Sequence, residues 1–342
     1  MHAVIITEPH HAEYQECEIP KIAPREILVR VRAVGICKSD VEVWHGTRPA
    51  PYVKYPVQLG HEWCGEIIEV GAQVQNLYAG QHVAVEGLNY CGACFFCLRG
   101  ETNLCEQYDE FGFTRPGGYA EYAAVRADLA HPFDTALAYE YAALCEPASC
   151  ACHAIERANI RAGDTVVIVG PGTIGLLCAA WAKIFSPAHI IVIGENRINA
   201  ALACDMGATH YFARDAAPRD AVRALTQGRG ADVVIEAAGS ANAFVLAMSL
   251  ARRGGTLIAE GIAGGGAQIA FQPDDLVLQD LRVHGIFSYA SRHFEKTLRA
   301  LESGALAVAP LITHTFPLSA FRDAFALLEQ RSERVGKVLM KP

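Results

Sequence analysis

The feature that most constrains the fold is a glycine-rich stretch in mid-chain, Thr165-Val-Val-Ile-Val-Gly-Pro-Gly-Thr-Ile-Gly175. An apolar β-branched run enters glycines spaced G-x-G-x-x-G, and a second apolar run follows. A buried strand that turns through glycines into a helix is typical of dinucleotide binding. In such a turn Gly170 permits the sharp reversal, Gly172 admits a pyrophosphate, and Gly175 lets helix and strand pack closely. The helix N-terminus offers N–H groups to the phosphates. The stretch therefore predicts a dinucleotide site at Gly170, Gly172, Thr173, Ile174 and Gly175.

Length and charge narrow the class of protein. A chain of 342 residues suits two domains. A formal net charge of −8 argues against a nucleic-acid partner, whose phosphates attract basic surfaces. The first nine residues lack the basic and apolar regions of a signal peptide, and no apolar run is long enough to cross a bilayer. We expect a cytoplasmic protein without nucleic-acid or membrane partners.

The pattern of predicted secondary structure changes near residue 151. Residues 1–150 are predicted to be β-rich, with short strands at 4–6, 26–34 and 66–70 punctuated by Pro and Gly. Strands then alternate with helices up to about residue 285, which predicts a doubly wound parallel sheet in an α/β protein. The predicted strands are 165–169, 189–193 and 231–236. Each is followed by a predicted helix, which begins at Ile174 in the first pair and spans 198–206 and 241–253 in the others. A further strand is predicted at 256–260. Helices are predicted at 294–302 and 318–331, and a short strand within 336–342.

Four of the twelve cysteines follow one another as C-x2-C-x2-C-x7-C, at Cys91, Cys94, Cys97 and Cys105. In a reducing compartment such a cluster indicates metal ligands rather than disulfides. Four thiolates complete a tetrahedral zinc shell and leave no open position, so the loop 91–105 predicts a structural zinc. An iron–sulfur cluster is the alternative. Seven further cysteines are expected to be small buried side chains: Cys17, Cys64, Cys145, Cys150, Cys152, Cys178 and Cys204.

A second set of metal-ligating residue types is split along the chain. Cys37 lies in Gly35-Ile-Cys-Lys-Ser-Asp40, and His61 and Glu62 follow Gly60. A cysteine, a histidine and a carboxylate are the three protein ligands of a catalytic zinc, with a fourth position left for water or substrate. The carboxylate is Glu62 or Glu146.

Taken together, these motifs resemble the zinc-dependent medium-chain dehydrogenases of the alcohol dehydrogenase superfamily. Gly117-Gly-Tyr-Ala-Glu-Tyr122, Glu146-Pro147, Ala231-Asp-Val-Val-Ile-Glu-Ala-Ala-Gly239 and Gly336-Lys337 complete the resemblance, in the family's order along nearly the whole chain. It implies a GroES-like catalytic domain from residues 1–150 and 286–342, a Rossmann coenzyme domain over 151–285, and an active site in the cleft between them. It also implies two zinc ions per chain and a homodimer or homotetramer.

The closer resemblance is to the polyol, sugar and aminocyclitol branch, through Ser39-Asp-Val-x-x-Trp44, Glu146-Pro-Ala-Ser149 and Gly285-Ile-Phe-Ser-Tyr289. It implies reversible oxidation of a secondary alcohol to a ketone, with the catalytic zinc held by Cys37, His61 and Glu62 and with Glu146 as a ligand or near the zinc-bound water. The chain departs from the pattern at Ser288, where polyol dehydrogenases usually have an arginine that recognises hydroxyls. It also departs at Val43, in place of an aromatic residue, and at Glu42, in place of a relay histidine. A threonine or simple alcohol dehydrogenase is the alternative enzyme. A zinc-bearing nucleic-acid module is disfavoured by the acidic charge.

The residues near these ligands suggest a proton route. Ser39 is the candidate acceptor of the substrate's hydroxyl proton, and Glu146 or His45 would pass it outward. Asp40 is expected to orient His61, because carboxylates commonly fix the tautomer of a metal-binding histidine.

The end of the second predicted strand bears on the choice of cofactor. NAD enzymes usually have an acidic residue there to hold the ribose hydroxyls. That position falls on Gly194, with Glu195 one residue late and Arg197 nearby. We expect a preference for NADP, whose 2′-phosphate Arg197 would accommodate, although Glu195 would serve NAD. Ala238, Gly261 and Lys337 complete the predicted cofactor contacts.

Overall fold

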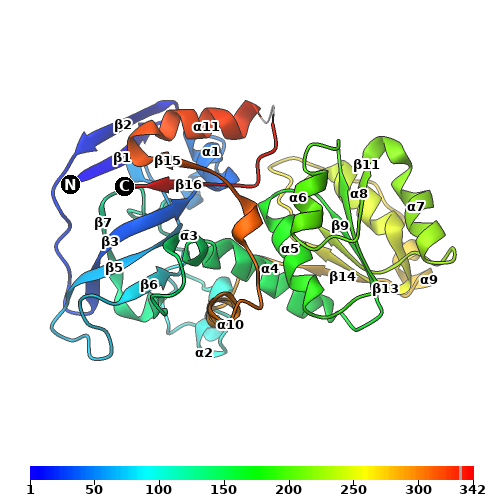
Figure 1. The fold of residues 1–342 in the computed structure, drawn as a ribbon, viewed down its shortest axis with the longest axis horizontal. Coiled ribbons are helices and arrows are strands. Elements are labelled where there is room, and N and C mark those ends of the chain that lie inside the picture. The colour runs from blue at the N-terminus through cyan, green and yellow to red at the C-terminus, as the bar shows by residue number, and fades with distance from the viewer. Residues whose placement is uncertain (331–332) are drawn as a thin grey trace. The chain divides into compact units, whose positions relative to one another are not determined.

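The structure, a computed structural model, describes residues 1–330 and 333–342 (Figure 1). The chain forms two compact units. Unit 1 comprises Met1–Glu146, Ala290–Gly304 and Ile312–Pro342, and unit 2 comprises Pro147–Tyr289 and Ala305–Leu311. The chain therefore leaves unit 1 near the predicted boundary at 150 and returns near the predicted boundary at 285. The return of residues 305–311 to unit 2 has no counterpart in the prediction.

Unit 1 is built around antiparallel β-sheet. A smaller sheet has the order β2-β1-β4, and a larger one has the order β15-β16-β3-β5-β6-β8, with β7 also paired to β3. In β3, apolar residues are buried while Arg30 and Arg32 are more exposed, which is the alternation the sequence predicts. The strands are β1 (His2–Glu8), β2 (His11–Glu16), β3 (Glu26–Gly35), β4 (Val57–Gln58), β5 (Glu62–Val70), β6 (His82–Val85), β7 (Tyr122–Arg126), β8 (Ala130–Pro132), β15 (Ile312–Pro317) and β16 (Lys337–Lys341).

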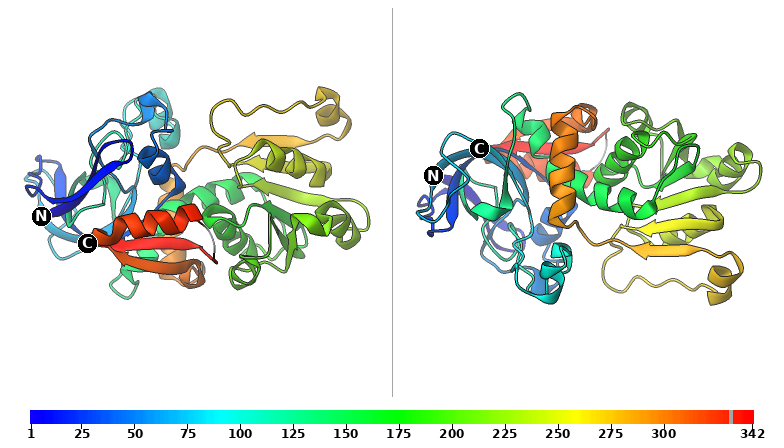
Figure 2. Two further views of the ribbon diagram at one scale, coloured as in Figure 1. Left: turned by 90° about the horizontal axis from the view of Figure 1, so that it is seen from above. Right: turned by 90° about the horizontal axis from the view of Figure 1, so that it is seen from below.

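The last segment of the chain completes the larger sheet of unit 1. β16 pairs with β3 in antiparallel register, with Leu339 opposite Gly35. Figure 2 (left) shows this last strand, in red, beside the helix that precedes it in the chain. The predicted helix 318–331 begins later, at Phe321, after a 3₁₀ turn, and its predicted end at Arg331 lies outside the described residues. The helices with residues in unit 1 are α1 (Lys38–Trp44), α2 (Phe95–Leu98), α3 (Tyr139–Ala142), α4 (Cys145–Ala158, which continues into unit 2), α10 (Ser291–Glu302) and α11 (Phe321–Gln330).

Unit 2 contains the predicted parallel sheet, in the order β11-β10-β9-β12-β13-β14. Its strands are β9 (Thr165–Val169), β10 (His189–Gly194), β11 (His210–Ala213), β12 (Ala231–Glu236), β13 (Ala251–Ala259) and β14 (Arg282–Gly285). Its helices are α5 (Thr173–Lys183), α6 (Ala200–Asp205), α7 (Pro218–Leu225), α8 (Ala241–Leu250) and α9 (Pro273–Leu278).

One predicted element of unit 2 is wrong at its end. The helix predicted over 241–253 stops at Leu250, and residues 251–253 already belong to β13. Ala251 pairs with Ala231 of β12, so a contact between distant segments ends the helix where its apolar pattern continues.

None of the described helices is long and apolar enough to cross a membrane.

The glycine turn leads from β9 into α5 as the spacing predicts. Gly170 has φ +112°, a conformation that side chains rarely adopt. A Cβ atom on Gly175 would lie 1.9 Å from the carbonyl oxygen of Gly170, so helix and turn are in direct backbone contact. A Cβ atom on Gly172, the residue that precedes α5, would meet nothing within 4 Å. The outer glycines are therefore needed by the fold, while the middle one leaves open space beside the helix N-terminus.

These glycines should respond differently to the same substitution. Gly175→Ala should lower the free energy of unfolding by about 1–3 kcal/mol, because the added methyl group must push the turn away from the helix. Gly172→Ala should change it by less than about 0.5 kcal/mol. Urea denaturation of the two variants beside the unchanged protein measures both. Equal stability of the two variants would contradict the assigned packing role of Gly175.

Candidate metal and cofactor sites

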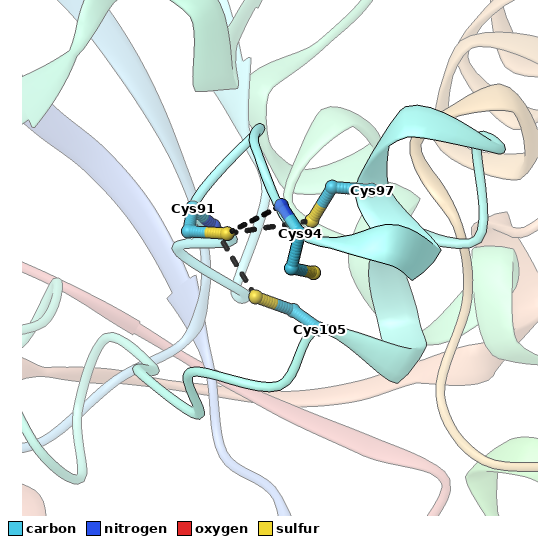
Figure 3. Close-up of side chains that lie close together, drawn as sticks. All are labelled: Cys91, Cys94, Cys97 and Cys105. Atoms are coloured by element: carbon cyan, nitrogen blue, oxygen red, sulfur yellow. Dashed lines mark hydrogen bonds between the residues drawn. The ribbon is translucent and has the colours of Figure 1, made fainter.

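The predicted cysteine loop brings its four thiols together (Figure 3). The sulfur atoms of Cys91, Cys94, Cys97 and Cys105 all lie within 4.8 Å of one another, and those of Cys91 and Cys97 are 3.9 Å apart. Gly92, with φ +72°, and the short helix α2 fold the segment back so that the thiols converge. Four partly buried soft ligands around one point form a closed tetrahedral set.

Backbone N–H groups of the loop point at these sulfurs. The amides of Ala93 and Cys94 donate to Cys91 Sγ at 3.4 and 3.3 Å and lower the pKa of that thiol. Hydrogen bonds from the backbone of Cys97 and Glu106 lower the pKa of Cys94 to about 6. In contrast, burial raises the pKa of Cys97 to about 12. All four sulfurs would be thiolates only with a cation among them, so the donor set fits a metal ion.

The second predicted set is brought together by strand pairing. β3 and β5 run antiparallel with Gly35 opposite Glu62. Cys37 follows β3 at the start of α1, and His61 immediately precedes β5. The ligand atoms of Cys37, His61 and Glu62 lie within 4.8 Å of one another, with Cys37 partly exposed and the other two buried. These residues offer one sulfur, one nitrogen and one oxygen ligand, which leaves a tetrahedral metal one open position.

Asp40, on the first turn of α1, supports this cluster. It is fully buried, and its Oδ2 accepts hydrogen bonds from the Cys37 backbone N–H at 2.8 Å and the Tyr119 hydroxyl at 3.1 Å. Its Oδ1 lies 3.6 Å from His61 Nδ1. Burial alone would lower the pKa of His61, but the charge of Asp40 raises it well above its usual value. Asp40 thus lies where the sequence predicts a group that orients His61.

The third ligand is held by a buried ion pair that the sequence did not indicate. The Lys337 ammonium, on a side chain only 2% exposed, donates to Glu62 Oε1 at 2.6 Å and to the Ile36 carbonyl at 2.9 Å. A Cβ atom on Gly35 would lie 2.0 Å from Glu62 Oε2, so a glycine is needed there for the carboxylate to fit. The ammonium of Lys337, which the sequence analysis predicts as a cofactor contact, points at the carboxylate of Glu62, a predicted metal ligand. The Gly336-Lys337 motif is the sequence feature that could have indicated this ion pair.

Glu146 lies near the cluster but outside the group of three ligands. It belongs to the first turn of α4 and is 7% exposed. A Cβ atom on Gly87 would be 3.4 Å from both Glu146 Oε1 and His61 Cβ, which places the carboxyl beside that histidine. Burial raises the pKa of Glu146 to about 8. The structure therefore gathers Glu62 with Cys37 and His61, and sets Glu146 in the surrounding shell.

The two other candidates for proton transfer lie at opposite ends of α1. Ser39 is its second residue and is partly buried, two positions after Cys37. His45 follows the helix, with its Nε2 2.5 Å from Glu329 Oε1 and its ring edge-on to His10 at 5.0 Å. Thus Ser39 remains close to a ligand along the chain, whereas the ring of His45 contacts α11 and the turn between β1 and β2.

In unit 2, the remaining predicted cofactor residues meet at the carboxyl edge of the parallel sheet. A Cβ on Gly170 would lie 2.7 Å from the Ala238 backbone nitrogen, and one on Gly261 would lie 2.3 Å from that of Gly239. Glu236 accepts hydrogen bonds from the Ala238 and Gly239 amides, both at 2.8 Å. The loops after β9, β12 and β13 therefore lie against one another where open α/β sheets bind ligands.

The region after β10 has a cation that the sequence analysis missed. A Cβ on Gly194 would lie 1.9 Å from the Tyr211 hydroxyl, so this tyrosine fills the space beside the glycine. A neighbouring cavity of about 510 Å³ is lined by Glu195, Asn196, Arg197, Ala213, Arg214 and Asp215. Within it, Arg214 Nη1 lies 3.0 Å from Glu195 Oε1. Arg214 directly follows β11, the strand next to β10. A basic residue at the carboxyl end of a strand beside β10 is the sequence feature that could have indicated this cation.

Most of the other cysteines are buried as predicted or partly so. Cys64, Cys145, Cys152 and Cys178 are buried, and Cys17 and Cys150 are intermediate. Cys204, on α6, is exposed, so the prediction of a buried side chain is wrong there.

Comparison with known proteins agrees with this arrangement. Residues 23–135 match the alcohol dehydrogenase GroES-like domain, and residues 173–303 match the zinc-binding dehydrogenase domain. The chain is 34% identical to the erythritol/L-threitol dehydrogenase of Mycolicibacterium smegmatis, covering 100% of this chain and 98% of that one. It is also 34% identical to the sorbitol dehydrogenase of Bacillus subtilis, covering 100% and 97%.

A solved structure shares the whole fold. The zinc-binding dehydrogenase from Sinorhizobium meliloti, bound to NADP, superposes with a TM-score of 0.92 at 31% identity, over 100% of this chain and 99% of that one. The fold, both sets of metal-ligating residues and these likenesses lead to the same conclusion: the chain belongs to the zinc-dependent medium-chain dehydrogenases of the alcohol dehydrogenase superfamily, in the branch of the polyol dehydrogenases.

Proposed function

We propose that this protein catalyses the reversible, NAD(P)-linked oxidation of a secondary alcohol of polyol, sugar or cyclitol type to a ketone. The observation that carries the proposal is the cluster of Cys37, His61 and Glu62, with its three different ligand atoms within 4.8 Å. Such a set suits a catalytic metal because it leaves a position for substrate. The similarity to erythritol/L-threitol and sorbitol dehydrogenases supports the substrate class.

In this proposal the chain's own residues hold and orient the reacting groups. Cys37, His61 and Glu62 are the ligands of a zinc ion, which when bound supplies a Lewis acid that lowers the proton affinity of an alcohol oxygen. Asp40 fixes the imidazole of His61, and Lys337 fixes the carboxylate of Glu62. The glycine turn of unit 2, with Gly170, Gly172 and Gly175, would hold the nicotinamide cofactor, which when bound would supply the hydride acceptor.

Ser39 is our candidate to receive the substrate's hydroxyl proton, because it stands two residues from Cys37 on the helix that Asp40 anchors. Glu146 or His45 would then carry the proton outward. Glu146 is supported by its place beside His61, and its burial favours a carboxyl group that holds a proton. His45 is supported by its partial exposure and by its contact with Glu329.

The second zinc would be structural and bound by Cys91, Cys94, Cys97 and Cys105, since four thiolates leave no open position. Thiolate sites of this kind persist in a reducing compartment, which supports a cytoplasmic location.

We also propose that the protein is a homo-oligomer, a dimer or a tetramer. β14 ends the sheet order of unit 2, so among residues 1–330 and 333–342 no strand pairs with its outer edge. Exposed apolar side chains lie nearby. On β14, Val283 is 39% exposed, and on α9, Val277 and Leu278 are 78% and 75% exposed. A second copy of this chain would cover them.

For the cofactor we propose a preference for NADP. Tyr211 fills the space at Gly194, where an acidic side chain would hold the ribose of NAD. Arg197 and Arg214 line the cavity beside it, and arginine suits a phosphate group. Glu195, paired with Arg214, is the group that would instead favour NAD.

A substrate panel tests the proposed reaction. We expect NAD(P)-dependent oxidation of four- to six-carbon polyols or cyclitols, measured as absorbance of the reduced nicotinamide, at a kcat/KM about tenfold or more above that for threonine or ethanol. Turnover of ethanol-type alcohols alone, or of threonine alone, would reject the polyol assignment.

Substitutions in the two proposed metal sites should have different effects on activity and stability. Cys37→Ala should reduce kcat at least about 1000-fold and leave the unfolding midpoint nearly unchanged, because it removes a ligand of the open site. Cys94→Ala should instead lower thermal stability or break the assembly, because metal binding there is coupled to folding. Each variant should retain about one of two zinc ions by elemental analysis. Exposed Cys204→Ala is the matched control, and full activity in Cys37→Ala would reject the catalytic site.

The cofactor preference can be measured directly. The kcat/KM for NADP should exceed that for NAD, and Arg214→Ala should reduce the NADP value about 10- to 100-fold with little effect on NAD, because one charged hydrogen bond to phosphate is lost. Glu195→Gln should raise the NADP preference by freeing Arg214. Arg229→Ala, outside the cavity, is the control. A higher efficiency with NAD in the unchanged protein would contradict the proposal.

A further inference from the structure

A polar network lies beside the proposed catalytic site and has no part in the mechanism above. Arg48 follows α1, and its Nε donates to the Tyr52 carbonyl at 3.0 Å. Its Nη2 donates to the Tyr108 hydroxyl at 2.8 Å and to Glu110 Oε2 at 3.2 Å. The Tyr108 hydroxyl also donates to Glu110. The Arg48 and Glu110 side chains are only 16% and 14% exposed, so this is a largely buried ion pair.

This network is one aromatic ring away from a metal ligand. The Arg48 guanidinium carbon lies 3.7 Å from the centre of the Phe113 ring. That ring lies 4.9 Å, centre to centre, from the imidazole of His61. Arg48, Glu110, Phe113 and His61 all belong to unit 1. The Phe113 ring therefore contacts both the Arg48 guanidinium and the His61 imidazole, and connects the network to the proposed metal site.

The network keeps hydrogen-bonding capacity unused. Among the described residues, Arg48 Nη1 donates to no protein acceptor, and Glu110 Oε1 accepts from no protein donor. A hydroxyl group both donates and accepts one hydrogen bond, so it satisfies an unused donor and acceptor of the same ion pair. Because the charges of Arg48 and Glu110 offset each other, the pair attracts a neutral group more than an anion.

We propose that Arg48 and Glu110 form a subsite for a second hydroxyl group of a neutral polyol, the one next to the carbon that is oxidised. This inference rests on the proposed function and deepens it. The subsite makes a diol a better substrate than a simple secondary alcohol, because only the diol has a second hydroxyl to pair with Arg48 and Glu110.

The test compares a polyol with 2-butanol, which offers no second hydroxyl. Arg48→Met keeps an apolar side chain over Phe113 but removes the donors. It should lower kcat/KM for the polyol about 10- to 100-fold and leave that for 2-butanol within about twofold. Arg115→Met is the matched control, because Arg115 also lies over an aromatic ring, that of Phe111 at 5.3 Å, and also pairs with a carboxylate, that of Asp109 at 3.0 Å. It should leave the ratio of the two substrates unchanged.

A second variant distinguishes recognition from support of the metal site. Glu110→Gln leaves the Arg48 charge unpaired, so it should raise the efficiency for an aldonate or polyol phosphate relative to the neutral polyol by about tenfold. A purely structural role predicts equal losses on every substrate, with loss of zinc, and that result would overturn the subsite. An unchanged polyol-to-butanol ratio in Arg48→Met would overturn it while the proposed function stands. Failure of the unchanged protein to oxidise any polyol would overturn both.

Discussion

The antiparallel pairing of β3 with β5 is the constraint on which the proposed catalytic site depends. It sets Gly35 opposite Glu62, and the residues just beyond that pair, Cys37 and His61, then meet although 24 positions separate them in the chain. Because register fixes which side chains share a face, a slip of one residue would turn Glu62 away from Cys37. The absence of a side chain at Gly35 leaves the space that the Glu62 carboxylate fills.

The same register also recruits the C-terminal strand. Leu339 of β16 pairs with Gly35, and this brings Lys337 to Glu62 and to the Ile36 carbonyl. Isolated buried charges are costly, and a buried pair is tolerated only when its geometry and further hydrogen bonds offset desolvation. The return of the chain to unit 1 therefore has a chemical consequence, since it supplies the counter-charge for the buried carboxylate of Glu62, a proposed metal ligand. Asp40 likewise supplies a negative charge beside the imidazole of His61.

The sequence predicts the geometry of the candidate sites most directly where the signal is local. Cys91, Cys94, Cys97 and Cys105 lie on one loop, and Gly170, Gly172 and Gly175 on one turn, so spacing alone implies their geometry. Prediction was weaker where partners are distant. Local pattern does not indicate the pairing of Lys337 with Glu62 or of Arg48 with Glu110, and the apolar pattern after Ala241 continues past the residue where β13 begins. In each case a long-range contact, invisible to local pattern, decides the outcome.

What the sequence by itself determined is the set of ligand types and their order: a closed four-cysteine loop, a cysteine–histidine–carboxylate set, and a glycine turn between a strand and a helix. These follow from residues a few positions apart. Only the tertiary structure decided between Glu62 and Glu146 as the carboxylate that joins Cys37 and His61, and only it placed Lys337, Tyr211 and Arg48. The reason is physical: burial, strand register and ion pairing act between segments that are remote in the chain, and they determine which of several suitable side chains reaches a given point in space.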